Sequence, residues 1–454
     1  MHFLKALLIW LLSVMVRHGI ASPLQQITTA TMGTQFRRES EPQWHVEFKP
    51  KNMTAHMDTL EKVEVTITNI AVENLNYISF RFKSDNNDLA RVDDIVMGTQ
   101  VDHLKRSWHG NITIDVIFLG STRINVEMTN SLDNTTELSK EYFDLIIIRK
   151  QRVIDHVFTG SVILLVSLLY INFGAALDLQ VLKGLIRRPV SPGIGIICQY
   201  AFMPLLSFAV GYFIFPDNVE MQLGLFFTGV SPSGGASNIW TVILGGNINL
   251  SVLLTTITNL AAFAMMPLWI FTLGHVIFTR GNLKVPYAKI ATYSIGLIVP
   301  LAIGLAIQKW APRVSRILAR LLKPISTCLI LFIIVFAIAT NVYLFKLFSW
   351  QIILAGLLLP WLGYIISWSV AKTFKQNSTD ALTIAIETGI QNTGIAIFLL
   401  KTLPQPQADL TIVIPVAVDI MTMFPLVGLY IYNKCTGRNI KDGVLTEEQQ
   451  NIRP

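Results

Sequence analysis

Residues 381–400 have the sequence ALTIAIETGIQNTGIAIFLL, an apolar stretch that carries one carboxylate and two glycines. The stretch is long enough to cross the roughly 30 Å hydrocarbon core of a bilayer. A carboxylate such as Glu387 costs about 2.5–3.5 kcal/mol at that depth on insertion scales, so it needs a binding partner. Its polar neighbours are hydroxyl and amide residues, and none is cationic. This pattern predicts a small cation that comes from outside the protein.

The rest of the chain has the composition of a membrane protein. Of its 454 residues, 52% are hydrophobic and 14% are charged, which is too apolar for an ordinary soluble domain. Nine apolar segments long enough to span a bilayer occupy residues 154–177, 191–215, 222–245, 250–278, 288–308, 325–345, 351–373, 380–400 and 408–432. We therefore expect a mostly α-helical, nine-helix domain over residues 154–433 that lies in a lipid bilayer.

The first residues predict a cleaved signal peptide over residues 1–21. Lys5 precedes an apolar run at 6–16 that is too short to span, and residues 19–21 (GIA) supply the small side chains for cleavage. A short membrane anchor is the alternative. A signal peptide places the N-terminal region on the extracellular or lumenal side of the plasma membrane or an internal membrane. Nine crossings then place the tail, residues 434–454, in the cytosol.

The basic residues support this orientation. Fourteen Lys and Arg fall in the connections and tail that we place in the cytosol, against five in the outer loops. Three more lie at 149–152 on the outer side, but a signal peptide fixes the orientation before they emerge. The net charge of +7 therefore follows membrane topology, and we predict no nucleic-acid partner.

Residues 40–150 predict a β-domain, preceded by a flexible linker at 22–39. Apolar and polar side chains alternate with period two in residues 63–68 and 78–83, and residues 142–148 form a final apolar strand. Several short strands separated by Asn, Asp and Gly favour a small all-β domain of the β-sandwich type.

Two further strands of this domain predict a hairpin, residues 112–118 and 123–128, joined by a turn at 119–122. The domain contains no cysteine, so it must fold by burial alone. Three sequons support its location outside the cytosol, and we expect glycosylation at Asn52, Asn111 and Asn134. A fourth sequon, at Asn377, falls in a cytosolic connection and should stay unmodified.

Two of the nine apolar segments are interrupted. Residues 228–238 (TGVSPSGGASN) contain a proline and clustered glycines, and residues 387–394 (ETGIQNTG) contain two glycines. Such residues break helices and leave backbone groups unpaired, which is tolerated at membrane depth only in a cavity or within protein. The two segments run in opposite directions. Interrupted segments in corresponding positions of two halves indicate an inverted repeat and the substrate site of a secondary transporter.

Polar side chains at the same depth have the chemistry that a hard cation such as Na⁺ requires. Ser251 and Thr255 are four residues apart and share a helix face, and Gln199 lies in the second segment. Hydroxyls, amides and free carbonyls supply neutral oxygens, and one carboxylate offsets the charge. The alternative is structural: Ser and Thr bond to their own helix, and Asn and Gln pair between helices.

Both interruptions resemble the crossover motifs of the sodium/bile acid cotransporter family. The matching residues are 232–238, 246–247 and 250–251 for the first crossover, 387–393 for the second, and smaller landmarks at 198–200, 203–204 and 265–268. The resemblance covers about residues 154–435. It departs where the family usually has Cys-Pro-Gly-Gly, because this chain has SPSGG at residues 231–235. The long N-terminal region resembles a branch of the family with extended lumenal N-termini.

The resemblance implies sodium-coupled symport of an amphipathic organic anion, such as a bile acid, sterol conjugate or sulfated steroid, by alternating access. It implies two sodium sites that share one carboxylate. The first would comprise Ser237, Asn238, Ser251, Thr255 and Glu387. The second would comprise Gln199, Glu387 and Gln391 with the carbonyls of Thr388 and Ile390. Asn392 would face the substrate.

A second carboxylate, Asp419, lies in the apolar run 416–421. It fits a substrate or proton contact, or a buried aspartate that bonds a neighbouring helix or stays uncharged.

Other classes of function fit the sequence less well. A serine protease would use Ser231 or Ser233, but the segment has no Gly-x-Ser-x-Gly elbow and no histidine at that depth, so we predict no enzyme activity. The alternative is a receptor or adhesion protein that uses the β-domain, although a receptor has no need of two broken segments. The sequence leaves open a homodimer.

Overall fold

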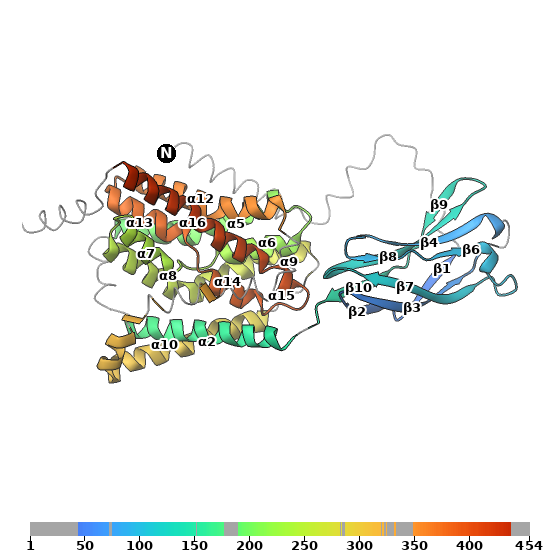
Figure 1. The fold of residues 1–454 in the computed structure, drawn as a ribbon, viewed down its shortest axis with the longest axis horizontal. Coiled ribbons are helices and arrows are strands. Elements are labelled where there is room, and N and C mark those ends of the chain that lie inside the picture. Colours follow the sequence, from blue (N-terminus) through green and yellow to red (C-terminus); the bar gives the residue numbers. More distant parts are fainter. Residues whose placement is uncertain are drawn as a thin grey trace, which may run out of the picture. The chain divides into compact units, whose positions relative to one another are not determined.

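The computed structural model describes residues 44–71, 75–150, 152–176, 189–281, 283, 287–318, 320–321, 324, 331–332 and 348–436. The predicted signal peptide, the linker and residues 437–454 of the predicted tail lie outside the described residues. The described residues form two compact units (Figure 1). One is the β-strand unit at 44–152, with which the short segment 405–410 groups, and the other is the helical unit at 153–404 and 411–436.

The β-domain consists of two sheets. The first has the strand order β1 (His45–Lys49), β3 (Thr59–Thr68), β7 (Trp108–Val116) and β5 (Ala90–Arg91). The second has the order β2 (Asn52–His56), β10 (Phe143–Ile148), β8 (Gly120–Asn130), β4 (Ile78–Ser84) and β6 (Ile95–Met97), with β9 (Thr135–Leu138) on β8. All pairs are antiparallel except β2 with β10.

The side chains that alternate with period two in the sequence lie on the inner and outer faces of these sheets. Along β7, Ile112, Ile114 and Val116 are fully buried and the residues between them are exposed. The inward side chains of both sheets form one apolar core, and Phe80 and Phe143 in it have no exposed surface. Burying each large apolar side chain contributes about 1.5–3 kcal/mol, so the core stabilises this domain without a disulfide. The predicted all-β region is confirmed.

The predicted hairpin is wrong. β7 and β8 are consecutive, but β7 pairs with β3 and β5, whereas β8 pairs with β10, β4 and β9 in the other sheet. Residues 117–119 cross between the sheets: the amides of Ile117 and Phe118 donate to the carbonyl of Leu89 at 2.8 and 3.2 Å, and Leu119 is buried. Alternation determines which face of a strand is buried but not which strand lies beside it.

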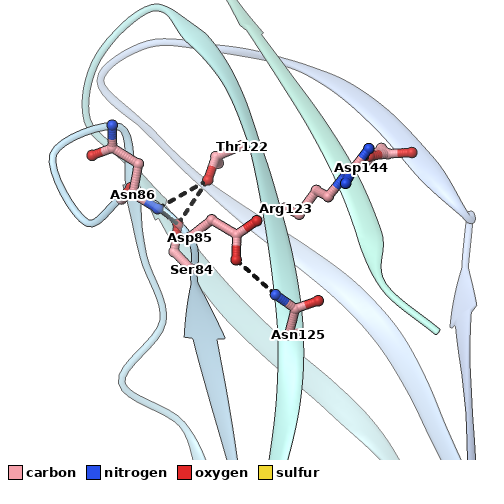
Figure 2. Close-up of polar contacts among 7 residues, drawn as sticks. All are labelled: Ser84, Asp85, Asn86, Thr122, Arg123, Asn125 and Asp144. Atoms are coloured by element: carbon pink, nitrogen blue, oxygen red, sulfur yellow. Dashed lines mark hydrogen bonds and ion pairs between the residues drawn. The ribbon is translucent and has the colours of Figure 1, made fainter. Parts of the chain in front are cut away.

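Polar contacts fix the turn after β4 to strand β8, as Figure 2 shows. Asn125 Nδ2 donates to Asp85 Oδ1 at 2.7 Å, and the hydroxyls of Ser84 and Thr122 are 3.1 Å apart. Ser84 and Thr122 are both buried, so their mutual hydrogen bond satisfies two groups that would otherwise be costly to bury.

Five helical stretches of the described chain are long and apolar enough to cross a membrane: Asp155–Ala175, Val190–Ile214, Ile248–Arg280, Trp350–Thr373 and Gln407–Cys435. They coincide with five of the nine predicted segments. A shorter apolar helix, Ile298–Trp310, lies in a sixth. Most of the predicted segment 325–345 lies outside the described residues. The mostly helical membrane region is therefore supported, and the number of nine crossings stays a prediction.

The uninterrupted helices are α2 (Val153–Ala176), α4 (Val190–Ile197), α5 (Met203–Ile214), α8 (Ile248–Trp269), α9 (His275–Arg280), α10 (Tyr287–Trp310), α12 (Trp350–Thr373) and α16 (Val413–Cys435), with the short α15 (Gln407–Leu410) before α16. Helices α2 and α10 lie side by side (Figure 1). A Cβ on Gly304 would come within 2.2 Å of the Ile171 carbonyl oxygen, so their close approach requires this glycine. A π-helical turn, Cys198–Phe202, joins α4 to α5 and carries Gln199.

Both interrupted segments consist of two short helices, as the sequence predicts. Residues 230–235 separate α6 (Val219–Gly229) from α7 (Ala236–Ile243), and residues 390–392 separate α13 (Ser378–Gly389) from α14 (Thr393–Leu400). None of these four helices is long enough to span a bilayer alone. Their broken ends meet inside the helical unit.

Candidate ion site at the crossing of the interrupted helices

The two interruptions pair with each other through their backbones. The amide of Gly234 donates to the carbonyl of Ile390 at 2.8 Å, and the amide of Asn392 donates to the carbonyl of Pro232 at 2.8 Å. These bonds form a short antiparallel bridge in which Ser233 lies opposite Gln391. Proline and glycine removed these groups from helical hydrogen bonding, and the crossing satisfies part of them.

Glu387 lies in the last turn of α13 and is 2% exposed. Its Oε2 accepts hydrogen bonds from Ser233 Oγ at 2.6 Å and from Thr255 Oγ1 at 2.8 Å, and its Oε1 accepts one from Ser251 Oγ at 2.5 Å. These hydroxyls are neutral, so they do not compensate a negative charge on the carboxylate.

The electrostatic surroundings of this carboxylate favour a cation. No ion pair in the described part of the chain involves Glu387, and the last turn of α13 has no basic residue. The negative end of the α13 dipole lies beside the carboxylate, which adds to the negative potential there. A buried carboxylate without a cationic neighbour is a group that an external cation can stabilise.

The other residues of the first predicted sodium site also lie here. Asn238 Oδ1 lies 2.9 Å from Ser251 Oγ, and Asn238 Nδ2 donates to Thr255 Oγ1 at 3.2 Å. Ser237 Oγ is 3.4 Å from Ser233 Oγ. The structure thus brings together all five predicted residues from α7, α8 and α13. Their hydroxyl, amide and carboxylate oxygens suit a hard cation such as Na⁺.

The residues of the second predicted site form a neighbouring network. Gln199 Nε2 donates to Gln391 Oε1 at 2.8 Å and to the Ser231 carbonyl at 2.7 Å, while Gln391 Nε2 donates to the Thr388 carbonyl at 2.6 Å. The carbonyl of Ile390 already accepts from Gly234. Several of the predicted oxygens therefore bond to one another.

Two oxygens of this network have no partner. Among the residues that the structure describes, Gln199 Oε1 and Thr388 Oγ1 are buried without a hydrogen bond. A buried polar atom without a partner costs about 1–3 kcal/mol, so a ligand that binds these oxygens gains that free energy back. The residues of the second predicted site are therefore chemically suited to a cation. The Thr388 hydroxyl is a candidate ligand in addition to the Thr388 carbonyl, which the resemblance implies.

The two predicted substrate residues, Asn392 and Asp419, are both buried. Asn392 caps α14, because its Oδ1 accepts from the Ile395 amide at 3.2 Å. Asp419 lies in α16 and is hydrogen-bonded by the Thr393 side chain, while its Oδ2 has no partner among the described residues. Asp419 thus has one oxygen bonded to the neighbouring helix and one available to a ligand.

Two residues of the site are ones that we do not predict from the sequence. Ser233 joins the five residues of the first predicted sodium site, and we call these six side chains the first cluster. It lies in a non-helical segment, where periodicity gives no signal. Asn259 on α8 donates to the carbonyls of Ser233 and Thr255 at 3.3 and 2.8 Å. Helical spacing does indicate Asn259, because it follows Ser251 and Thr255 on the same face at intervals of four residues.

The fold and the site define a class of protein, a helical membrane protein with two interrupted helices that cross at a buried, oxygen-rich carboxylate. Comparison with known sequences shows which family this chain is similar to. Residues 162–348 match the model of the Sodium Bile acid symporter family. The match includes the first interrupted segment and ends before the second.

Several curated sequences are similar to this chain. The P3 protein of Homo sapiens is 31% identical over 251 residues, which cover 54% of this chain and 52% of the relative. The ileal sodium/bile acid cotransporter of Oryctolagus cuniculus is 29% identical over 298 residues, 63% of this chain and 84% of the relative. The sodium-dependent organic anion transporter of Bos taurus is 31% identical over 252 residues, 55% and 65% respectively. The chain spans about half the length of the P3 proteins that it matches.

Proposed function

We propose that this chain is a sodium-coupled symporter that moves an amphipathic organic anion, such as a bile acid, sterol conjugate or sulfated steroid, by alternating access. The observation that carries this proposal is Glu387, which is buried among hydroxyl and amide oxygens at the crossing and has no basic partner among the residues that the structure describes. Sodium-dependent relatives and the family match support the same conclusion.

Sodium binding would stabilise the crossing because the ligating groups come from three separate elements. Glu387 belongs to α13, and its hydroxyl neighbours belong to α8 and to the break before α7. A cation held by all three stabilises their contact, which is the arrangement that binds substrate in our proposal. Two Na⁺ ions against one carboxylate leave a net charge of +1 in the site. An anionic substrate offsets this charge, and the site holds sodium weakly enough to release it into a low-sodium cytosol.

The substrate lies beside the second crossing in this proposal. The anionic group would lie near the N-terminus of α14, where the helix dipole is positive. Asn392 caps this terminus, and Asp419 contacts its first residue, Thr393. The free Oδ2 of Asp419 suits a hydrogen-bond donor, such as a sterol hydroxyl, rather than the anionic group itself.

The test is uptake of labelled sterol conjugates and sulfated steroids by cells that express the full chain, in sodium and in a potassium replacement. At least one compound should accumulate only in sodium. Accumulation that is equal in both media contradicts coupling, and no transport of any compound favours the receptor or adhesion alternative. The same panel with Asp419→Asn tests the substrate contact, because an unchanged preference among compounds removes Asp419 from the site.

We further propose that the β-domain lies outside the cytosol and that the C-terminal tail lies within it. Asn52, Asn111 and Asn134 have exposed side chains, which glycosylation requires. Replacing each by Gln should remove one increment of the mass that a glycosidase releases, measured by gel mobility. Asn377→Gln is the matched control, because this sequon lies in a cytosolic connection and caps α13. Loss of a glycan in that variant alone would indicate the opposite orientation.

A further inference from the structure

Ser233 differs from Thr228 and Ser231, two other buried hydroxyl residues of the first interrupted segment. Thr228 Oγ1 and Ser231 Oγ each donate to a carbonyl one helical turn earlier in the chain, Gly224 and Phe227, at 2.8 Å. These two side chains satisfy their own helix. Ser233 Oγ instead donates across the crossing to Glu387 Oε2 at 2.6 Å, and Ser233 has no exposed surface.

The backbone holds Ser233 in this position from both sides. Its neighbours Pro232 and Gly234 make the two hydrogen bonds of the bridge to the second interruption, and its own carbonyl accepts from Asn259 Nδ2 at 3.3 Å. The position of its Cβ is therefore set by the crossing itself. Rotation of the hydroxyl hydrogen can then turn the oxygen from a donor to the carboxylate into a lone-pair ligand without moving the main chain.

We propose that Ser233 is an additional ligand of the sodium ion at Glu387, a role that deepens the proposed function and rests on it. Its oxygen lies 3.4 Å from Ser237 Oγ and shares Glu387 Oε2 with Thr255 Oγ1. The site then has six ligating side chains: Ser233, Ser237, Asn238, Ser251, Thr255 and Glu387. A neutral oxygen added to this set raises sodium affinity without adding charge, so release remains possible.

The test measures sodium binding without a substrate. The full-length protein is purified in detergent, and its melting temperature is titrated with NaCl against choline chloride at constant ionic strength, since a ligand that binds the folded state raises the melting temperature. Ser233→Ala removes only the oxygen. The half-saturating sodium concentration should rise about 3–10-fold, as expected for loss of one favourable contact.

Ser231→Ala is the matched control, because its buried hydroxyl lies two residues away and bonds to Phe227. It should titrate within about twofold of the unmodified protein, since less than 0.5 kcal/mol is at stake in sodium binding. Any packing defect of either variant appears as a lower melting temperature in choline alone. A Ser233→Ala titration equal to that of the unmodified protein, while Glu387→Gln loses the sodium effect, overturns the role of Ser233 and leaves the proposed function standing. No sodium effect in the unmodified protein overturns both.

Discussion

Replacing Glu387 by glutamine should abolish sodium-dependent uptake. The substitution keeps the shape of the side chain and removes the one negative charge among the oxygens of the first cluster. Removing one partner of a buried charge pair costs about 3–5 kcal/mol, which corresponds to a loss of more than about 100-fold in sodium affinity. The measurement is the initial rate of uptake, in sodium and in choline, of whichever compound the panel identifies.

Two comparisons make this result interpretable. Surface labelling of the variant separates a loss of transport from a loss of protein at the membrane. Glu220→Gln removes a carboxylate from the first turn of α6, away from the crossing, and should transport normally. Sodium-dependent uptake by Glu387→Gln at the rate of the unmodified protein, with equal surface labelling, would contradict the assignment of Glu387 as the shared sodium ligand.

Replacing Gly234 by alanine should disrupt the crossing itself. A Cβ at this position would lie 2.7 Å from the carbonyl oxygen of Gln391 and 3.1 Å from its carbon. Both atoms belong to the backbone, so no side-chain rotation relieves the contact. Separating the strands of the bridge weakens the hydrogen bond from Gly234 to Ile390 and moves Ser233 away from Glu387. Overpacking of this kind costs about 1–3 kcal/mol.

The melting temperature of the purified protein and its sodium-dependent uptake should therefore both fall in Gly234→Ala. Gly193→Ala is the control, because a Cβ there meets no atom within 4 Å and Gly193 lies inside helix α4. Alanine is about 0.8–1 kcal/mol more favourable than glycine in a helix, so the control should be equal to or more stable than the unmodified protein. An unchanged melting temperature in Gly234→Ala would show that the two interruptions are not packed as tightly as their backbone contacts indicate.

Local chemistry explains which features of this site can be predicted from sequence. Glu387 is conspicuous because a carboxylate in an apolar stretch requires a partner, whatever the rest of the fold. Proline and glycine mark both interruptions because they disfavour helix at their own positions. Ser251 and Thr255 can be placed together because helical spacing relates them.

The contact of Ser233 with Glu387 and the pairing of strand β7 cannot be predicted from spacing in the sequence. Ser233 meets Glu387 across 154 positions of chain, and only the backbone bridge between the two interruptions orients it. In the β-domain, β7 and β8 have the alternation of a hairpin, yet they pack in opposite sheets because residues 117–119 cross the core. The alternation is the same in both arrangements, so it does not choose between them.

An N-terminal β-rich region, an apolar helical region with two broken helices and a carboxylate that needs a binding partner can all be predicted from the sequence. Each of these follows from the preference of a residue for its immediate surroundings. The folded structure is needed to see which oxygens surround Glu387, that the two interruptions pair through their backbones, and that Ser233 lies among those oxygens. These features arise where segments far apart in the chain meet, and their geometry depends on the packing of whole helices.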